Sequence, residues 1–197
     1  MYTAKQALAR LAAGNARFVA GRARFPTVRK EVLAALAKEQ RPYATIVGCS
    51  DSRVPPELVF DAGFGELFIV RVAGNVMTAG VWGSLQYAGV HLRTPLFVVL
   101  GHEGCGAVKA AVARKFHGAR ERSRIAALLE CILPGLRGLR AGRSPARLLA
   151  AAVEANVRWS MHQLLDTPEG QARMAEGIVK LVGAIYELKT GRVRFLP

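Results

Sequence analysis

"PLFVVLGHEGCGAV", residues 95–108, passes from a nearly continuous apolar run into a turn that holds His102 and Cys105 among three glycines. A short apolar run bounded by turn residues is typical of a strand that is covered on both faces in a parallel sheet. Three further runs have the same character and lie at 43–49, 66–72 and 178–188. The sequence therefore predicts four buried strands.

Segments with helical spacing alternate with these runs and lie at 77–91, 104–115, 121–133 and 148–165. Alternating strands and helices are typical of an α/β protein, so we expect a mainly parallel central sheet that is flanked by helices and joined by right-handed crossovers. Near the end of the chain, "ELKTGRVRFL" (187–196) predicts a hairpin that turns at Thr190 and Gly191. This hairpin would add an antiparallel edge strand to the sheet.

The first forty residues differ from the rest, because apolar residues recur at helical spacing in 3–20 and again in 30–39. We therefore expect an N-terminal helical arm over 1–39 of a single domain, 1–197, in which no repeat or linker is visible. The longest apolar stretches are far shorter than the roughly 20 residues that span a bilayer, so we expect no membrane partner. Three cysteines, an odd number, and an N-terminus without a secretory pattern favour a reduced, cytoplasmic location.

The charge is strongly basic, with 28 lysines and arginines against 14 acidic residues and a formal net charge of +14. Such a charge attracts anionic partners in general. Arginines crowd 114–147, but no aromatic residue lies between Phe116 and Trp159, so the stacking platform of single-strand binders is missing there. We expect a solvated basic face and no specific nucleic-acid partner.

Reactive side chains follow two of the predicted strands. One run ends at Cys49, and the run 95–101 leads into His102 and, three residues later, Cys105. Open parallel sheets place their sites at the carboxyl ends of strands, and two thiolates with one imidazole would form a three-ligand zinc site whose fourth position is open. A cysteine nucleophile served by His102 is an alternative, although it leaves the other thiol unexplained.

The remaining cysteine and histidines lack such neighbours. Cys131 lies within a predicted helix, and we interpret it as a buried apolar residue. His91, His117 and His162 have no cysteine within three residues, so we expect them on the surface or packed against helices.

The two reactive stretches also carry a family resemblance. "CSDSR" matches the Cys-x-Asp-x-Arg motif of the beta-class carbonic anhydrases, and "GHEGCGA" matches their Gly-His-x-x-Cys-Gly motif. The flanking segments "LARLAAGNARFVAGR", "GELFIVRVAGN" and "GSLQYAGVHL" resemble the family's N-terminal arm, second strand and following helix. The resemblance implies one Zn²⁺ per chain, held by Cys49, His102 and Cys105, and reversible hydration of carbon dioxide to bicarbonate and a proton by zinc-bound hydroxide. It also implies a homo-oligomer, either a dimer or a dimer of dimers.

Given these ligands, the charges at Asp51 and Arg53 can be assigned catalytic roles. Pairing with Arg53 would offset the charge of Asp51 and keep its carboxylate off the open metal position. Asp51 could then accept a hydrogen bond from the hydroxide and orient it toward carbon dioxide. By resemblance, Gln40 is expected to donate to a substrate oxygen, and the expected pocket lining is Phe68, Val72, Ala73 and Tyr87.

Two positions depart from patterns within the family. Ile46 stands where a bicarbonate-regulated subgroup has a tryptophan that forms part of a regulatory bicarbonate pocket, which argues against inhibition by bicarbonate bound there. Ala184 stands where many relatives have tryptophan. A carbonyl sulfide or carbon disulfide hydrolase on the same zinc scaffold is an alternative function. A non-catalytic, zinc-stabilised basic binding module is a second alternative, although it would not need Asp51, Arg53 or Gln40.

Overall fold

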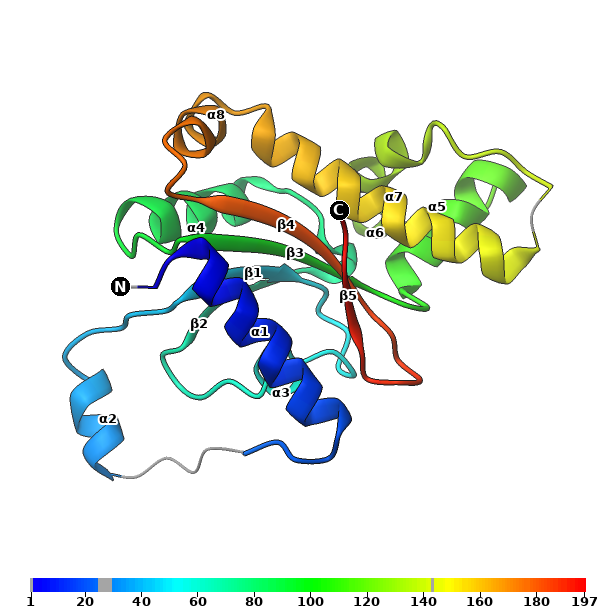
Figure 1. Ribbon diagram of the computed structural model, residues 1–197. Helices are drawn as coiled ribbons and strands as arrows, with labels where there is room; N and C mark the ends of the chain where they lie inside the picture. Colours follow the sequence, from blue (N-terminus) through cyan, green and yellow to red (C-terminus); the bar gives the residue numbers. More distant parts are fainter. Residues whose placement is uncertain (1, 25–29, 143) are drawn as a thin grey trace.

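The computed structural model describes residues 2–24, 30–142 and 144–197, and Figure 1 shows their path. Its sheet has five strands in the order β2-β1-β3-β4-β5. The four parallel strands are β1 (Ala44–Gly48), β2 (Leu67–Arg71), β3 (Leu96–His102) and β4 (Lys180–Tyr186), and β5 (Val193–Phe195) pairs antiparallel with β4. The predicted α/β fold is confirmed, including the hairpin, in which Gly191 adopts a φ of +71° that a glycine tolerates without strain.

The helices agree with the predicted segments, apart from two that the spacing missed. The predicted ones are α1 (Ala4–Val19), α2 (Lys30–Leu36), α4 (Ala79–Val90), α5 (Gly106–His117), α6 (Ser123–Ile132) and α7 (Pro145–Leu165). The missed ones are the short α3 (Pro56–Val59) and α8 (Pro168–Ala175). Two 3₁₀ turns, η1 (Ala73–Asn75) and η2 (Leu133–Leu136), complete the description.

The sheet is covered by helices on both sides (Figure 1). The alternation of side chains along β3 shows which helices cover each side. Phe97 and Val99 belong to the core that β3 forms with α4, α5, α6 and α7. Leu96, Val98 and Leu100 belong to the core on the other side, with α1 and α3. All residues of β3 are buried, as expected for a central parallel strand.

The prediction that every core strand is buried on both faces is wrong for β2. Four of its five residues are only half-buried, and the last, Arg71, is exposed. The reason is its position at the edge of the sheet, where it pairs with β1 alone. An apolar run at a sheet edge therefore remains incompletely covered within one chain.

The first helix of the arm is fastened to the rest of the chain by Asn15, which is buried. Its side-chain amide donates to the carbonyl oxygens of Val59 (3.1 Å) and Gly191 (2.8 Å), and its Oδ1 accepts from the backbone N–H of Val193 (2.8 Å). These bonds join α1 to α3 and to the C-terminal hairpin. The second predicted helix, 30–39, ends earlier than expected, at Leu36.

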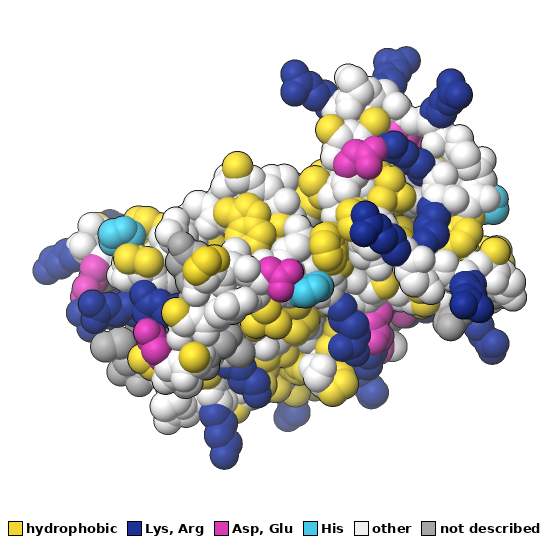
Figure 2. All heavy atoms as spheres, turned by 90° about the horizontal axis from the view of Figure 1, so that it is seen from above, with side chains coloured by type: hydrophobic (Ala, Val, Ile, Leu, Met, Phe, Trp, Pro, Cys, Tyr) yellow, Lys and Arg dark blue, Asp and Glu magenta, His cyan; other side chains and the backbone are white. Residues whose placement is uncertain are grey.

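The surface carries the basic excess in a dispersed form. Figure 2 shows Lys and Arg side chains spread around the face that it displays, some of them beside acidic groups. One example is Arg114 of α5, which pairs with Glu130 of α6. Among the described residues, no helix is long and apolar enough to cross a membrane.

Candidate metal centre

Three potential metal ligands meet at the carboxyl ends of β1 and β3. Cys49 follows β1 directly, and His102 is the last residue of β3. Cys105 immediately precedes α5, which begins at Gly106, whereas the predicted helix 104–115 would include it. Because Gly48 pairs with Leu100 in the parallel ladder, the two strand ends lie side by side. The ligand atoms of the three residues all lie within 4.8 Å of one another.

The two sulfur atoms are reduced and separated by 4.0 Å. Contact with Cys105 lowers the pKa of the Cys49 thiol below its usual value, whereas the same contact and burial raise the pKa of Cys105. The pair thus gives up one proton readily and retains the other, which a bound cation would displace. Two thiolates on a tetrahedral zinc ion, at about 2.3 Å each, lie about 3.8 Å apart, so the observed spacing fits this ion.

His102 presents one ring nitrogen to the sulfur atoms. Its Nδ1 lies 2.9 Å from the carbonyl oxygen of Glu103, so Nδ1 carries the proton and donates to that oxygen. Nε2 is therefore an acceptor, and it is buried with no hydrogen-bond partner. A buried polar atom without a partner is costly, and a cation between Nε2 and the two sulfurs would satisfy it. The donor set of two sulfurs and one imidazole nitrogen fits zinc.

Asp51 lies beside this group and is held by Arg53. Its Oδ1 accepts from the backbone N–H of Arg53 (3.0 Å) and from Nε (2.9 Å), and its Oδ2 accepts from Nη2 (2.7 Å). The side-chain hydrogen bonds from Arg53 hold the pKa of Asp51 well below its usual range. Oδ2 is also 3.9 Å from Nε2 of His102, so an ionised, restrained carboxylate faces the ligands.

Arg71 is a supporting residue that the sequence reasoning missed. From the end of β2, its Nε donates to the carbonyl oxygen of Cys49 (2.9 Å) and its Nη2 donates to that of Asp51 (2.6 Å). It therefore fixes the loop that presents both side chains. The sequence did contain a signal for this residue, because Arg71 is a cation near the end of the otherwise apolar run 66–72.

The expected pocket residues divide into two groups. Val72 and Ala73 lie near the ligands, since the N–H of Val72 donates to the carbonyl oxygen of Gly48 (3.1 Å) and the N–H of the next glycine, Gly74, donates to the sulfur of Cys49 (3.3 Å). These contacts place the start of η1 directly beside the first ligand.

Phe68, Tyr87 and Gln40 are not brought to the ligands of their own chain. Phe68 pairs with Thr45, four residues before Cys49, which is about 13 Å along the strand. Tyr87 lies against Phe68, with ring centroids 6.1 Å apart, and is 46% exposed. Gln40 is exposed and precedes β1, whereas Cys49 follows it, so the two lie toward opposite ends of that strand.

The other histidines and Cys131 lie outside the ligand group. His91, His117 and His162 are exposed; His91 lies against Tyr87, and the rings of His162 and Trp159 are nearly perpendicular, with centroids 5.9 Å apart. Cys131 is half-buried in α6 rather than fully buried as expected.

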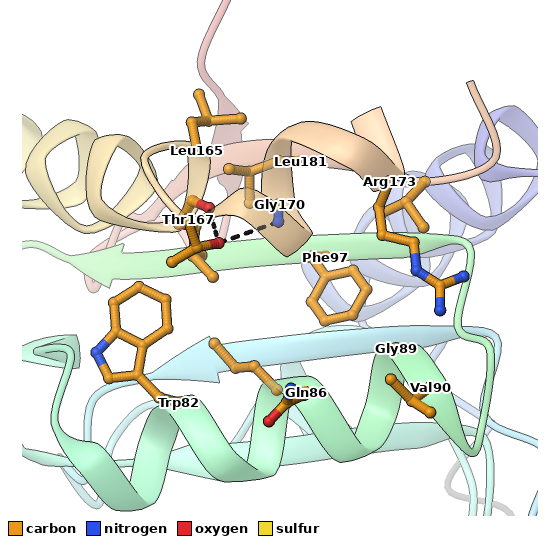
Figure 3. Close-up of a pocket in the computed structure, with 13 residues that line it drawn as sticks. Trp82, Gln86, Gly89, Val90, Phe97, Leu165, Thr167, Gly170, Arg173 and Leu181 are labelled. Atoms are coloured by element: carbon orange, nitrogen blue, oxygen red, sulfur yellow. Dashed lines mark hydrogen bonds between the residues drawn. The ribbon is translucent and has the colours of Figure 1, made fainter. Parts of the chain in front are cut away.

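A separate cavity of about 260 Å³ lies between α4 and the connection from α7 to α8 (Figure 3). Trp82, Phe97 and Leu181 contribute to its mainly apolar lining. Phe97 and Leu181 lie near the starts of β3 and β4, whereas the metal ligands follow the strand ends. The cavity is therefore not part of the metal centre.

Comparison with known proteins places this geometry in a family. The family model described as carbonic anhydrase matches residues 44–193. A protein named carbonic anhydrase from Mycolicibacterium smegmatis is 41% identical over 181 residues, which cover 91% of this chain and 87% of that protein. Carbonic anhydrase 2 from Mycobacterium tuberculosis is 41% identical over 185 residues, with 91% and 86% covered.

Solved structures agree with this result. The beta-carbonic anhydrase CcaA is 25% identical and superposes with a TM-score of 0.74 over 96% of this chain and 95% of that one. The beta-carbonic anhydrase CafA of Aspergillus fumigatus is 27% identical, with a TM-score of 0.74 and coverage of 84% and 80%. Together with the arrangement of Cys49, His102 and Cys105, these similarities show that the chain belongs to the beta-carbonic anhydrase family.

Proposed function

We propose that this protein catalyses the reversible hydration of carbon dioxide to bicarbonate and a proton, with one zinc ion held by Cys49, His102 and Cys105. The observation that carries the proposal is the buried, unpartnered Nε2 of His102, which faces two reduced sulfurs beside the restrained carboxylate of Asp51. A zinc ion would supply a Lewis acid that makes water nucleophilic near neutral pH. The mycobacterial relatives named carbonic anhydrase support the same activity.

Asp51 would orient the attacking water. Since Arg53 keeps this carboxylate ionised, Asp51 can only accept hydrogen bonds, and its Oδ2 faces the ligands. Nε and Nη2 of Arg53 donate to Oδ1 and Oδ2 of Asp51, so the carboxylate cannot turn toward the cation without breaking these hydrogen bonds. A purely structural metal site would require neither residue.

Val72 and Ala73 would line the substrate pocket beside Cys49. Carbon dioxide is small and apolar, so an apolar wall at this position suits it. The backbone contacts of Val72 and Gly74 with the first ligand segment keep that wall close to the metal.

The active form would be a homo-oligomer, either a dimer or a dimer of dimers. Gln40, Phe68 and Tyr87 lie away from the ligands of their own chain, so they can reach a metal centre only in a second copy. The half-buried β2 supports this, as do two exposed apolar side chains next to it, Phe64, which precedes the strand, and Tyr87, which lies against Phe68. Among proteins with this fold, the beta-carbonic anhydrases of Sordaria macrospora are tetrameric.

A cytoplasmic location would suit the metal centre. Two thiols only 4.0 Å apart must remain reduced to bind a cation, and reducing compartments maintain that state.

The experiment is stopped-flow hydration of carbon dioxide by the purified oligomer, with metal content measured on the same sample. We expect one zinc per chain and rapid hydration, both lost in Cys49→Ser and both retained in Cys131→Ser, which changes a cysteine outside the ligand group. Carbonyl sulfide offers a similar electrophilic carbon, so its hydrolysis is measured in parallel. A zinc-loaded protein that hydrolyses carbonyl sulfide faster than it hydrates carbon dioxide would contradict the proposal.

A further inference from the structure

The turn η1 delivers a hydrogen bond to one of the two sulfurs. The backbone N–H of Gly74 donates to Sγ of Cys49 at 3.3 Å. Gly74 and Asn75 both have left-handed backbone conformations, with φ values of +71° and +45°. A Cβ at Gly74 would lie 2.9 Å from Cδ1 of Ile132, so the turn is also tightly enclosed. The left-handed conformation is without strain at Gly74 but less favourable at Asn75, so external hydrogen bonds help to hold the turn.

Helix α7 provides that support through two side chains. Nδ2 of Asn156 donates to the carbonyl oxygen of Gly74 (2.8 Å), and Oγ of Ser160 donates to that of Asn75 (3.0 Å). Each of the two side chains is only 1% exposed. Because residues four apart lie on the same helix face, both donors approach the turn from one side. The carbonyl groups of Gly74 and Asn75 are thereby fixed in orientation.

These polar side chains are unusual for their surroundings. Most other buried residues of α7 are apolar, among them Leu148, Val153 and Val157. Oδ1 of Asn156 and Nδ2 of Asn75 are buried without a partner, so part of this arrangement is energetically unfavourable. Apolar residues at positions 156 and 160 would leave the buried carbonyl oxygens of Gly74 and Asn75 without donors. Asn156 and Ser160 therefore hold the conformation of the turn that donates to Cys49.

We propose that Asn156 and Ser160 are positioning residues of the metal centre, which aim the N–H of Gly74 at the sulfur of Cys49. A hydrogen bond to a thiolate reduces the charge that the sulfur gives to a metal and fixes the sulfur in place. In a centre with two thiolates, this leaves the cation a stronger Lewis acid. The inference rests on the proposed function only in requiring that Cys49 binds a metal.

The test uses the full-length oligomer with cobalt(II) in place of zinc, and the variants Asn156→Ala and Ser160→Ala. Loss of the hydrogen bond raises the energy of the sulfur electrons, so we expect the sulfur-to-cobalt charge-transfer absorption to move to lower energy in both variants. We also expect zinc transfer to a chelator to accelerate roughly tenfold, as is usual when a partner of a ligand is removed. Two variants are used because either one alone could fail to fold.

Leu148→Ala is the matched control, because Leu148 is a buried residue of the same helix, two turns before Asn156. It should lower the melting temperature at least as much as the other variants, yet leave the absorption and the zinc transfer rate unchanged. Unshifted absorption in both polar variants, or an equal shift in Leu148→Ala, would overturn the proposal. If the cobalt spectrum shifts as expected while the zinc protein fails to hydrate carbon dioxide, the proposed function fails and the positioning role stands. A parent protein that binds neither metal would overturn both.

Discussion

Arg53→Ala tests whether the restraint on Asp51 serves catalysis. The substitution removes the bonds from Nε (2.9 Å) and Nη2 (2.7 Å), and only the backbone N–H of residue 53 still donates to Oδ1. Oδ2 then has no donor, and it already lies 3.9 Å from Nε2 of His102. The freed oxygen can therefore reach the cation and block its open position.

The expected loss of carbon dioxide hydration is at least roughly tenfold, the size usual for removing a partner that orients a group at a metal. The loss should be largest at low pH, since the carboxylate stays ionised while hydroxide becomes scarcer. The assay is stopped-flow hydration from about pH 6.5 to 9 with zinc content measured in parallel, a range in which an ordinary carboxylate is fully ionised. Zinc should be retained, and Arg158→Ala, which breaks a pair with Glu154 on α7, should leave the rate unchanged. If Arg53→Ala stays within twofold of the parent at every pH, the pair has no catalytic role.

Further predictions concern stability and regulation. Because the pKa of Asp51 is lower in the folded chain than in the unfolded one, the Asp51–Arg53 pair stabilises the fold above about pH 4 and loses this effect as the pH falls further. In urea unfolding, the free energies of unfolding of Arg53→Ala and the parent should therefore converge in acid. A difference that stays constant with pH would contradict this. Gly101→Ala should lower the free energy of unfolding in urea by about 1–3 kcal/mol, because its Cβ would lie 2.5 Å from Cγ2 of Val157. Combining it with Val157→Ala should recover part of this loss. If the two changes in unfolding free energy simply add, the clash is refuted. Since the buried position 46 holds isoleucine rather than the tryptophan of the bicarbonate-regulated subgroup, hydration rates should show no cooperative inhibition by added bicarbonate, and a sigmoidal dependence on bicarbonate would refute this interpretation.

The fold was largely predictable because the relevant signals are local. The apolar run that became β3 is buried throughout, and the Thr190–Gly191 turn identified the antiparallel hairpin. The four-residue helix α3 left no periodic signal, since it is too short for one. The apolar pattern alone also could not distinguish the edge strand β2 from the central strand β3. It indicates that a strand has apolar faces to bury, but not whether the same chain or a second copy buries them.

The cluster of Cys49, His102 and Cys105 could be predicted because its members follow two recognisable apolar runs, and the Asp51–Arg53 pair could be predicted because opposite charges stand two positions apart. Arg71 stood out as a cation at the end of an apolar run, but its partners and those of Asn156 could not be predicted, since both side chains donate to backbone carbonyls that are distant in sequence. Their contribution depends on how β2 and α7 are placed by the complete fold. The position of Gln40 could have been anticipated, because a five-residue strand of about 16 Å separates it from Cys49.

The central claim is a three-ligand metal centre with an open position, and a crystal structure at neutral pH with anomalous scattering at the zinc edge tests it most directly. We predict one zinc per chain, about 2.3 Å from the sulfurs of Cys49 and Cys105 and about 2.0–2.1 Å from Nε2 of His102. Asp51 should remain bound to Arg53. Zinc bound elsewhere, ligation through Nδ1 of His102, or Asp51 as the fourth ligand would contradict this account.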